Sequence, residues 1–273
     1  MFSEMLAAVR NTVPLIHNIT NYVTVNDCAN ILLACGGSPI MSDDADEVEE
    51  ITSLCAGLVI NIGTLNQRTI PSMLAAGKRA NELRHPVVLD PVGAGASRLR
   101  TDTALRLLRE VRFAVIRGNM SEIRTLALGS GSTRGVDADV ADRVTDENLD
   151  EAAAFVKQFA RETGAVVAVT GAIDIIADGE RAFCIRNGDG MMSRVTGTGC
   201  QLSAMTGAYV AANPGHTLEA AAAAVCAMGL CGEKARQRMT EQDGNASYRT
   251  YIIDAICNLT PEELEKGARY DIR

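Results

Sequence analysis

The amino-acid sequence predicts an α/β fold of three layers, in which a mostly parallel central sheet is flanked by helices on both faces. Apolar residues make up 47% of the 273 residues, and this core is aliphatic, with no Trp and only five Phe and five Tyr. Runs of Ala, Val, Leu and Ile suit parallel strands that are buried on both faces. Short apolar runs also alternate with longer amphipathic ones, which is the β-α-β-α order of such sheets.

Four short apolar runs are predicted to be buried strands: residues 56–62, 86–89, 111–116 and 165–169. Each run ends in small or polar residues, among them Asp90, Arg117, Asn119 and Thr170. Ligands of open α/β sheets bind outside the carboxyl ends of the strands. These strand ends are therefore the first place to expect a site.

Helical periodicity between the strands predicts helices over residues 67–83, 102–109 and 146–163. Residues 173–177 and 181–185 flank Asp178-Gly179, which predicts a hairpin at a sheet edge. The chain is then predicted to be helical to its end, over 199–211, 217–238, 247–258 and 261–267. No repeat, low-complexity segment or Pro/Gly-rich linker interrupts it, so we expect one domain over residues 1–273.

The charge pattern argues against nucleic acid and against a membrane as partners. The formal net charge is −8, and no Lys/Arg cluster offers the footprint that a phosphate backbone needs. The Ala-rich residues 219–232 are too few to span a bilayer. Residues 1–10 include Glu4 and no apolar core of a signal peptide, so we expect a cytoplasmic protein.

The eight cysteines do not have the spacing of a metal site. They form no Cys-x-x-Cys pair, and the chain has only three histidines. We expect reduced, mostly buried thiols, which fits a reducing compartment.

A glycine turn precedes the first helix of the C-terminal part. Residues 195–200 read VTGTGC, so Gly197 and Gly199 let the backbone turn sharply and approach a ligand. The helix that follows would offer unpaired N–H groups and a partial positive charge to a phosphate. The alternative is that both glycines are ordinary turn residues. No P-loop sequence is present, and no Gly-x-Gly-x-x-Gly opens an early β-α unit.

A second group of polar residues surrounds the predicted end of a strand at Arg117. Asn119 is placed to cap the following helix, and Glu122 comes three residues later. One interpretation is a simple capping box, in which Glu122 returns to the Asn119 N–H. The other is that Glu122 and Asp90 organise the water shell of Mg²⁺ beside ATP.

These residues closely resemble the hydroxyethylthiazole kinase family. The resemblance runs in order from about residue 10 to about residue 260. Its segments are residues 17–23 (HNITNYV), 37–41 (GSPIM), 61–64 (NIGT), 90–93 (DPVG), 117–119 (RGN) with Glu122, 169–171 (VTG) and 196–200 (TGTGC).

The resemblance implies a ribokinase-like fold and an ATP- and Mg²⁺-dependent kinase. Its acceptor would be the primary alcohol of 4-methyl-5-(2-hydroxyethyl)thiazole, in thiamine biosynthesis or salvage. Members of this family form homotrimers with the active site between subunits, so a similar assembly is expected here.

The resemblance also assigns roles to residues. Met41 and Gly197 look like contacts of the thiazole, with Asn21 and Gly63 as further members of that pocket. The other assignments are ATP contacts at Arg117, Thr170 and Asn119, magnesium at Asp90 and Glu122, and a catalytic turn of Gly197, Gly199 and Cys200.

Two of the family's positions have a plain structural interpretation as well. Met41 follows Ser-Pro-Ile and suits core packing, although a thioether also packs well on an aromatic heterocycle. We expect His17 to be a structural hydrogen-bonding residue outside the catalytic set.

Cys200 stands where the wider superfamily has an Asp that acts as a base. The pKa of a thiol is ordinarily ~8.5, and a neutral thiol is a poor base. Phosphoryl transfer is largely dissociative and needs little deprotonation of the alcohol, so positioning and charge stabilisation are expected to carry most of the rate.

Two rival functions stay open. A hydroxymethylpyrimidine kinase of the same fold would differ in residues 18–41, and a non-catalytic thiazole- or nucleotide-binding protein would need neither Asp90 nor Glu122.

Overall fold

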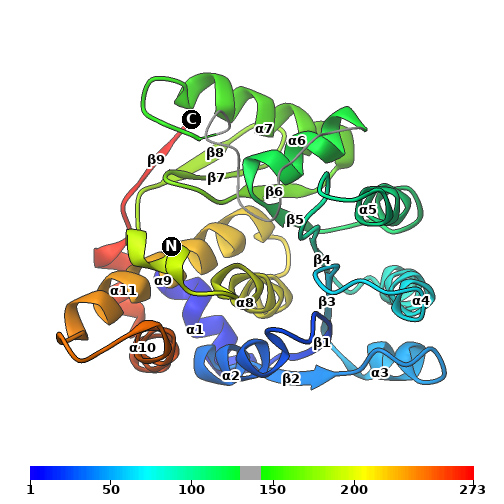
Figure 1. Ribbon diagram of the computed structural model, residues 1–273, viewed down its shortest axis with the longest axis horizontal. Coiled ribbons are helices and arrows are strands. Elements are labelled where there is room, and N and C mark those ends of the chain that lie inside the picture. The colour runs from blue at the N-terminus through cyan, green and yellow to red at the C-terminus, as the bar shows by residue number, and fades with distance from the viewer. Residues whose placement is uncertain (130–142) are drawn as a thin grey trace.

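A nine-stranded sheet runs through the computed structural model, which describes residues 1–129 and 143–273 (Figure 1). The strand order is β2-β1-β3-β4-β5-β6-β7-β8-β9, with the first six parallel and the last three antiparallel. The strands are β1 (Leu15–Ile19), β2 (Ser38–Met41), β3 (Gly57–Asn61), β4 (Val87–Asp90), β5 (Val115–Gly118), β6 (Val166–Val169), β7 (Asp174–Ala177), β8 (Ala182–Ile185) and β9 (Tyr270–Ile272).

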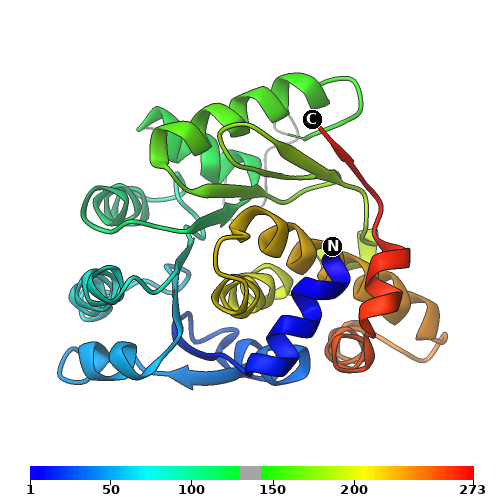
Figure 2. The same cartoon turned by 180° about the vertical axis from the view of Figure 1, so that it is seen from behind.

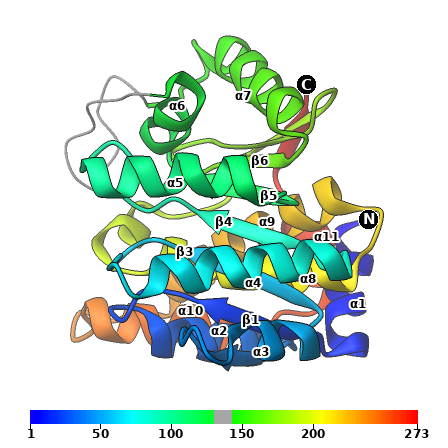
Figure 3. The same cartoon turned by 90° about the vertical axis from the view of Figure 1, so that its right-hand side faces the viewer.

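Helices cover both faces of the sheet, as the three views show (Figures 1, 2 and 3). One face is covered by α1 (Phe2–Thr12), α2 (Val25–Cys35), α8 (Thr198–Ala212), α9 (Thr217–Arg238), α10 (Asn245–Asn258) and α11 (Pro261–Gly267). The other is covered by α3 (Val48–Leu54), α4 (Thr69–Leu83), α5 (Arg98–Glu110), α6 (Met120–Leu128) and α7 (Leu149–Thr163).

The central strands are apolar along most of their length, up to the polar residues at their carboxyl ends, because each contributes to two cores. In β3, Val59 packs into the core under α8 and α9, whereas Leu58 and Ile60 pack into the core under α4 and α5. Successive side chains of a strand point to opposite faces, so both parities must be apolar here. The predicted three-layer fold is confirmed.

The predicted strands and helices are present, with shifted ends. β5 spans Val115–Gly118 instead of residues 111–116, so Arg117 lies inside the strand. α5 begins at Arg98 because Ser97 caps it, with its side chain accepting the Arg100 N–H.

The expectation that the chain is helical to its end was wrong in one place, because the last residues form β9, which pairs with β8. The β7–β8 hairpin is therefore covered by a further strand and is not the sheet edge. A three-residue strand is too short to show an alternating pattern, so its sequence did not predict it. A short 3₁₀ helix, Gly190–Arg194, precedes the glycine turn.

Within residues 1–129 and 143–273, no helix combines the length and the hydropathy that a bilayer crossing requires. All eight cysteines are free, and six are buried. Cys257, near the end of α10, is exposed, and the expectation of mostly buried thiols is confirmed. The same described residues contain no cluster of three or more His, Cys, Asp or Glu side chains that fits a metal ion.

Candidate active site

A cavity of about 340 Å³ opens at the carboxyl ends of the parallel strands. It lies where Asn21 follows β1 and Gly63 follows β3, the point at which the strand order changes direction. The predicted site residues that line it are Asn21, Gly63, Asp90, Arg117, Asn119, Glu122, Gly197, Gly199 and Cys200.

Two predicted site residues do not line this cavity. Thr170 follows β6 and reaches it only through Arg117, whose Nη2 donates to Thr170 Oγ1 at 2.6 Å. Met41 ends β2, beside Asn18 of β1, and is partly buried against the core. The packing interpretation of Met41 therefore holds within this chain.

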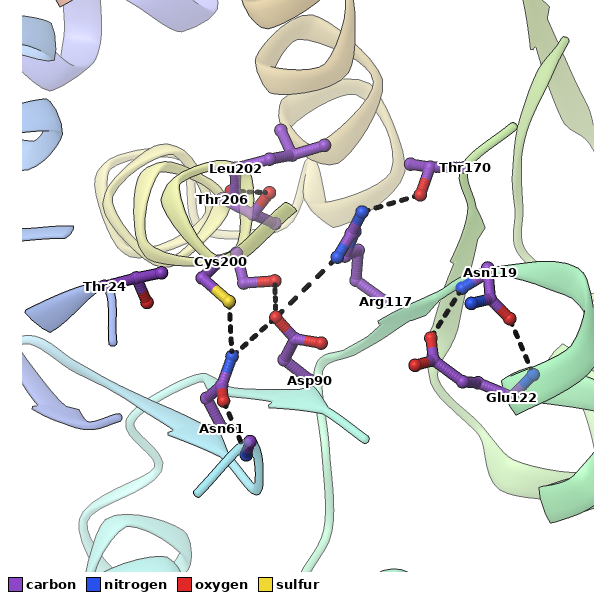
Figure 4. A network of polar contacts seen from close by, with 12 residues as sticks. Thr24, Asn61, Asp90, Arg117, Asn119, Glu122, Thr170, Cys200, Leu202 and Thr206 are labelled. Atoms are coloured by element: carbon purple, nitrogen blue, oxygen red, sulfur yellow. Dashed lines mark hydrogen bonds and ion pairs between the residues drawn. The ribbon is translucent and has the colours of Figure 1, made fainter. Parts of the chain in front are cut away.

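Asp90 is the fully buried carboxylate at the floor of the site (Figure 4). Its Oδ2 accepts from Asn61 Nδ2 at 2.8 Å and from Ser203 Oγ at 2.7 Å. Arg117 Nη1 lies 3.7 Å from the same oxygen. Burial raises the pKa of Asp90, although Arg117 and the two hydrogen bonds oppose this shift. Its Oδ1 is buried and lacks a protein partner among the described residues.

Arg117 is held against the glycine turn. A Cβ at position 199 would lie 2.6 Å from Arg117 Nη1, so only glycine lets the guanidinium pack on the first turn of α8. The Arg117 side chain is 13% exposed, and its Nε is buried without a partner in the part of the chain that the structure describes. The sheet and the turn therefore fix this cation at the cavity wall.

The α8 helix begins without a side-chain cap. Gly197 is its N-cap residue, with a φ of 91°, and a Cβ there would lie 2.6 Å from Thr24 Cγ2. The first N–H groups of a helix have no partner within the helix, and they attract anions. The predicted helix start at this turn is confirmed, and phosphate binding there stays a prediction.

Cys200 is bound through its sulfur. Asn21 Nδ2 lies 3.2 Å from Cys200 Sγ and donates to it. Asn61 Nδ2 lies 3.3 Å from the same sulfur and also donates (Figure 4). Burial, and then the charge of Asp90, raises the pKa of the Cys200 thiol. The free site therefore favours a neutral thiol over a thiolate.

Glu122 forms the predicted capping box and also lines the cavity. Its Oε2 accepts the Asn119 N–H and its Oε1 accepts the Gly93 N–H, each at 2.8 Å, while Asn119 Oδ1 accepts the Glu122 N–H. Burial, and then the charge of Asp90, raises the pKa of Glu122 to about 7. Glu122 can therefore close the capping box and also face a Mg²⁺ ion in the cavity.

The donor set fits Mg²⁺. Asp90 offers a buried oxygen that has no partner in the described part of the chain, and Glu122 offers a second carboxylate beside it. Mg²⁺ keeps several waters and takes one or two carboxylates together with substrate phosphates, so it needs no cluster of three protein ligands.

Sequence reasoning missed four residues that shape the site: Thr24, Asn61, Arg100 and Ser203. Ser203 carried a usable signal, because it lies three residues after Cys200 on one face of α8. His17 is outside the cavity and bonds Thr52 Oγ1 and the Ser42 carbonyl, which confirms its structural role.

Known proteins resemble this chain over nearly its whole length. The model of the hydroxyethylthiazole kinase family matches residues 6–262. A hydroxyethylthiazole kinase of Clostridium acetobutylicum is 65% identical, covering 99% of each chain. One of Desulfovibrio desulfuricans is 50% identical, covering 100% of this chain and 98% of the relative.

Solved structures agree. A hydroxyethylthiazole kinase protein from Pyrococcus horikoshii OT3 has a TM-score of 0.88 at 38% identity, covering 100% of this chain and 98% of that one. The pyridoxal kinase from Staphylococcus aureus in complex with ADP has a TM-score of 0.54 at 16% identity, covering 80% and 87%, and shares the ribokinase-like fold alone. With the family model and full-length relatives in agreement, the chain belongs to the hydroxyethylthiazole kinase family.

Proposed function

We propose that this protein transfers the γ-phosphoryl group of ATP to the primary alcohol of 4-methyl-5-(2-hydroxyethyl)thiazole, in thiamine biosynthesis or salvage. One observation carries the proposal: the uncapped start of α8, the Asp90–Arg117 pair and Glu122 share one cavity. Binding of a neutral thiazole alone would need none of these charged groups. The names of the full-length relatives identify the acceptor.

The transfer is an in-line exchange at the γ-phosphorus. The alcohol oxygen forms a bond to phosphorus while the bridging β–γ P–O bond breaks, and ADP leaves with that electron pair. The alcohol proton passes to a phosphoryl oxygen or to water. The α8 N–H groups and Arg117 stabilise the charge of the transferring group, which is the main contribution that protein groups make to this reaction.

Asp90 and Glu122 would hold Mg²⁺, which would neutralise negative charge on the ATP phosphates. Cys200 has a different role from a base. Its sulfur accepts the N–H groups of Asn21 and Asn61, so the neutral thiol positions the amides beside the acceptor.

A homotrimer with active sites between subunits is part of the proposal. Met41 is at the outer strand of the sheet and away from this chain's own cavity, which is consistent with a contact to a neighbouring subunit's acceptor. Val23 lines the cavity while 58% exposed, so the cavity wall offers apolar surface to a partner.

The cellular location and the domain organisation are also part of the proposal. The free cysteines support a reducing, cytoplasmic location. We propose one kinase domain over residues 1–273.

ADP release measured with three acceptor conditions tests the function. We expect ADP with the thiazole alcohol and little with hydroxymethylpyrimidine or without an acceptor. Faster turnover of the pyrimidine alcohol would identify the rival kinase. No ADP under any condition, with ATP still bound, would identify a binding protein.

Subunit mixing tests the assembly. Met41→Asp and Asp90→Asn are each expected to inactivate the homo-oligomer, and refolding the two variants together should restore part of the activity. Restoration requires Met41 and Asp90 of one site to come from different chains. A monomer by light scattering, or no recovery on mixing, would contradict the trimeric site.

A further inference from the structure

A second guanidinium lies at the cavity, and neither the sequence motifs nor the mechanism above uses it. Arg100 is in the first turn of α5, where its backbone N–H donates to Ser97 Oγ at 3.3 Å. Its half-buried side chain lines the same cavity as Arg117 and Glu122. The cavity wall therefore carries two arginines that come from different elements.

Arg100 is fixed in place by the loop that follows β4. Its Nη1 donates to the Val92 carbonyl at 2.8 Å. A Cβ on Gly93 would lie 2.5 Å from Nη1 and 3.3 Å from Cζ, so the guanidinium rests directly on the Gly93 backbone. Gly93 also has a φ of 74°, which side-chain-bearing residues rarely adopt. The left-handed backbone of Gly93 and its lack of a side chain leave room for the Arg100 guanidinium.

The same glycine connects Arg100 to the proposed magnesium side of the site. The Gly93 N–H donates to Glu122 Oε1 at 2.8 Å, so the guanidinium and the Glu122 carboxylate both contact one residue. An anion held near Glu122 through Mg²⁺ would therefore lie beside Arg100.

The two arginines differ in how their charge is balanced. Arg117 lies 3.7 Å from Asp90 and donates to Thr170. Arg100 makes no ion pair with any carboxylate of residues 1–129 and 143–273, and its one side-chain hydrogen bond there uses a single Nη1 donor. A guanidinium has five N–H donors and stays charged, so Arg100 keeps donors for a ligand.

We propose that Arg100 is a phosphate-contacting residue that binds the β- and γ-phosphate oxygens of ATP on the Glu122 side of the cavity. This inference rests on the proposed kinase function. The thiazole alcohol carries no anionic group, so the polyphosphate is the substrate portion that matches an unbalanced guanidinium. The competing role is structural: Arg100 would only hold the loop at Val92 and Gly93.

Nucleotides of different phosphate number separate the two roles. ATP, ADP and AMP binding is measured by calorimetry in Mg²⁺ buffer for wild type, Arg100→Ala, Arg100→Met and Arg100→Lys. We expect Arg100→Ala and Arg100→Met to weaken ATP binding about 10- to 100-fold, the range of charge-assisted hydrogen bonds, and AMP binding less than about twofold. Arg100→Lys should keep part of the ATP affinity because it keeps the charge.

Arg98→Ala is the matched control. Arg98 lies two residues away on the same helix, its side chain is 94% exposed, and it pairs with Asp102 outside the cavity. This variant should bind all three nucleotides as the wild type does. Arg100→Met retains the apolar stem of the side chain and keeps the test usable if Arg100→Ala unfolds.

The outcomes distinguish this inference from the kinase assignment. Equal losses for ATP and AMP, or unchanged ATP binding in Arg100→Met, would overturn the phosphate contact while leaving a wild-type kinase intact. A wild type that binds ATP but phosphorylates no alcohol would overturn the proposed function and leave the Arg100 contact standing.

Discussion

Cys200 Sγ lies 3.2 Å from Asn21 Nδ2, so the thiol sulfur accepts an N–H in the free site. Asn61 donates to the same sulfur, and burial raises the pKa of the thiol. An acceptor of two amide N–H groups that resists ionisation is suited to positioning, and poorly suited to removing a proton at neutral pH.

Cys200→Ala is therefore expected to lose less than ~10²-fold in kcat, because general-base help is worth at least that much where it operates. Cys200→Asp should keep or raise kcat if the carboxylate fits. Turnover at saturating ATP and thiazole measures both, with Cys257→Ala as the control because that thiol is exposed on α10. Complete loss of turnover in a correctly folded Cys200→Ala variant would instead indicate that Cys200 acts as the general base.

Arg117→Lys should lower kcat/KM for ATP about 10- to 100-fold, with little change in the KM of the thiazole. A lysine cannot reach Asp90 and Thr170 together through a planar fork. The range is that of a charge-assisted hydrogen bond. In a double-mutant cycle with Thr170→Val, the two losses in kcat/KM should be less than additive. Strict additivity would show that the Arg117–Thr170 contact does not contribute to kcat/KM.

Gly199→Ala should reduce activity by displacing Arg117, since the added Cβ would lie 2.6 Å from its Nη1. Gly190→Ala is the matched control, because a Cβ there meets nothing within 4 Å. Steady-state kinetics and thermal unfolding of both variants check the prediction. Equal activity of the two variants would mean that Arg117 adapts without consequence.

Loss of the Glu122 proton should make the free protein less stable as pH rises. Burial raises its folded-state pKa from about 4.5 to about 7, so between these values the folded chain holds a proton that the unfolded chain has lost. The free energy of unfolding should therefore fall across this window by up to ~3 kcal/mol relative to Glu122→Gln. Urea denaturation without Mg²⁺ and nucleotide measures it, and parallel pH curves for the two proteins would refute the shift.

The sequence predicted the strand ends better than the contacts between them. Asp90 and Arg117 were identifiable because parallel strands end at one edge of the sheet, and each follows an apolar run. The links from Asn61 to Asp90 and Cys200 were not, because they join residues far apart in the chain. Periodicity reports which face is buried and carries no information on which polar side chains meet.

The same limit explains Met41 and β9. A methionine at a strand end suits a ligand or a core equally well, and only the packing of β2 places it beside the core. β9 pairs with β8 across the intervening residues 186–269, so no local sequence pattern indicates that pairing.

The register of β3 and β4 places Asn61 directly opposite Asp90. A slip of one residue between these strands would turn every side chain to the other face and separate the amide from the carboxylate. A chain with this register error would leave the buried Asp90 carboxylate without the Asn61 N–H donor. It would also leave the Cys200 sulfur with only one of its two amide donors. Specific activity after refolding therefore reports the fraction of molecules with correctly aligned strands, since misaligned molecules would not retain the site.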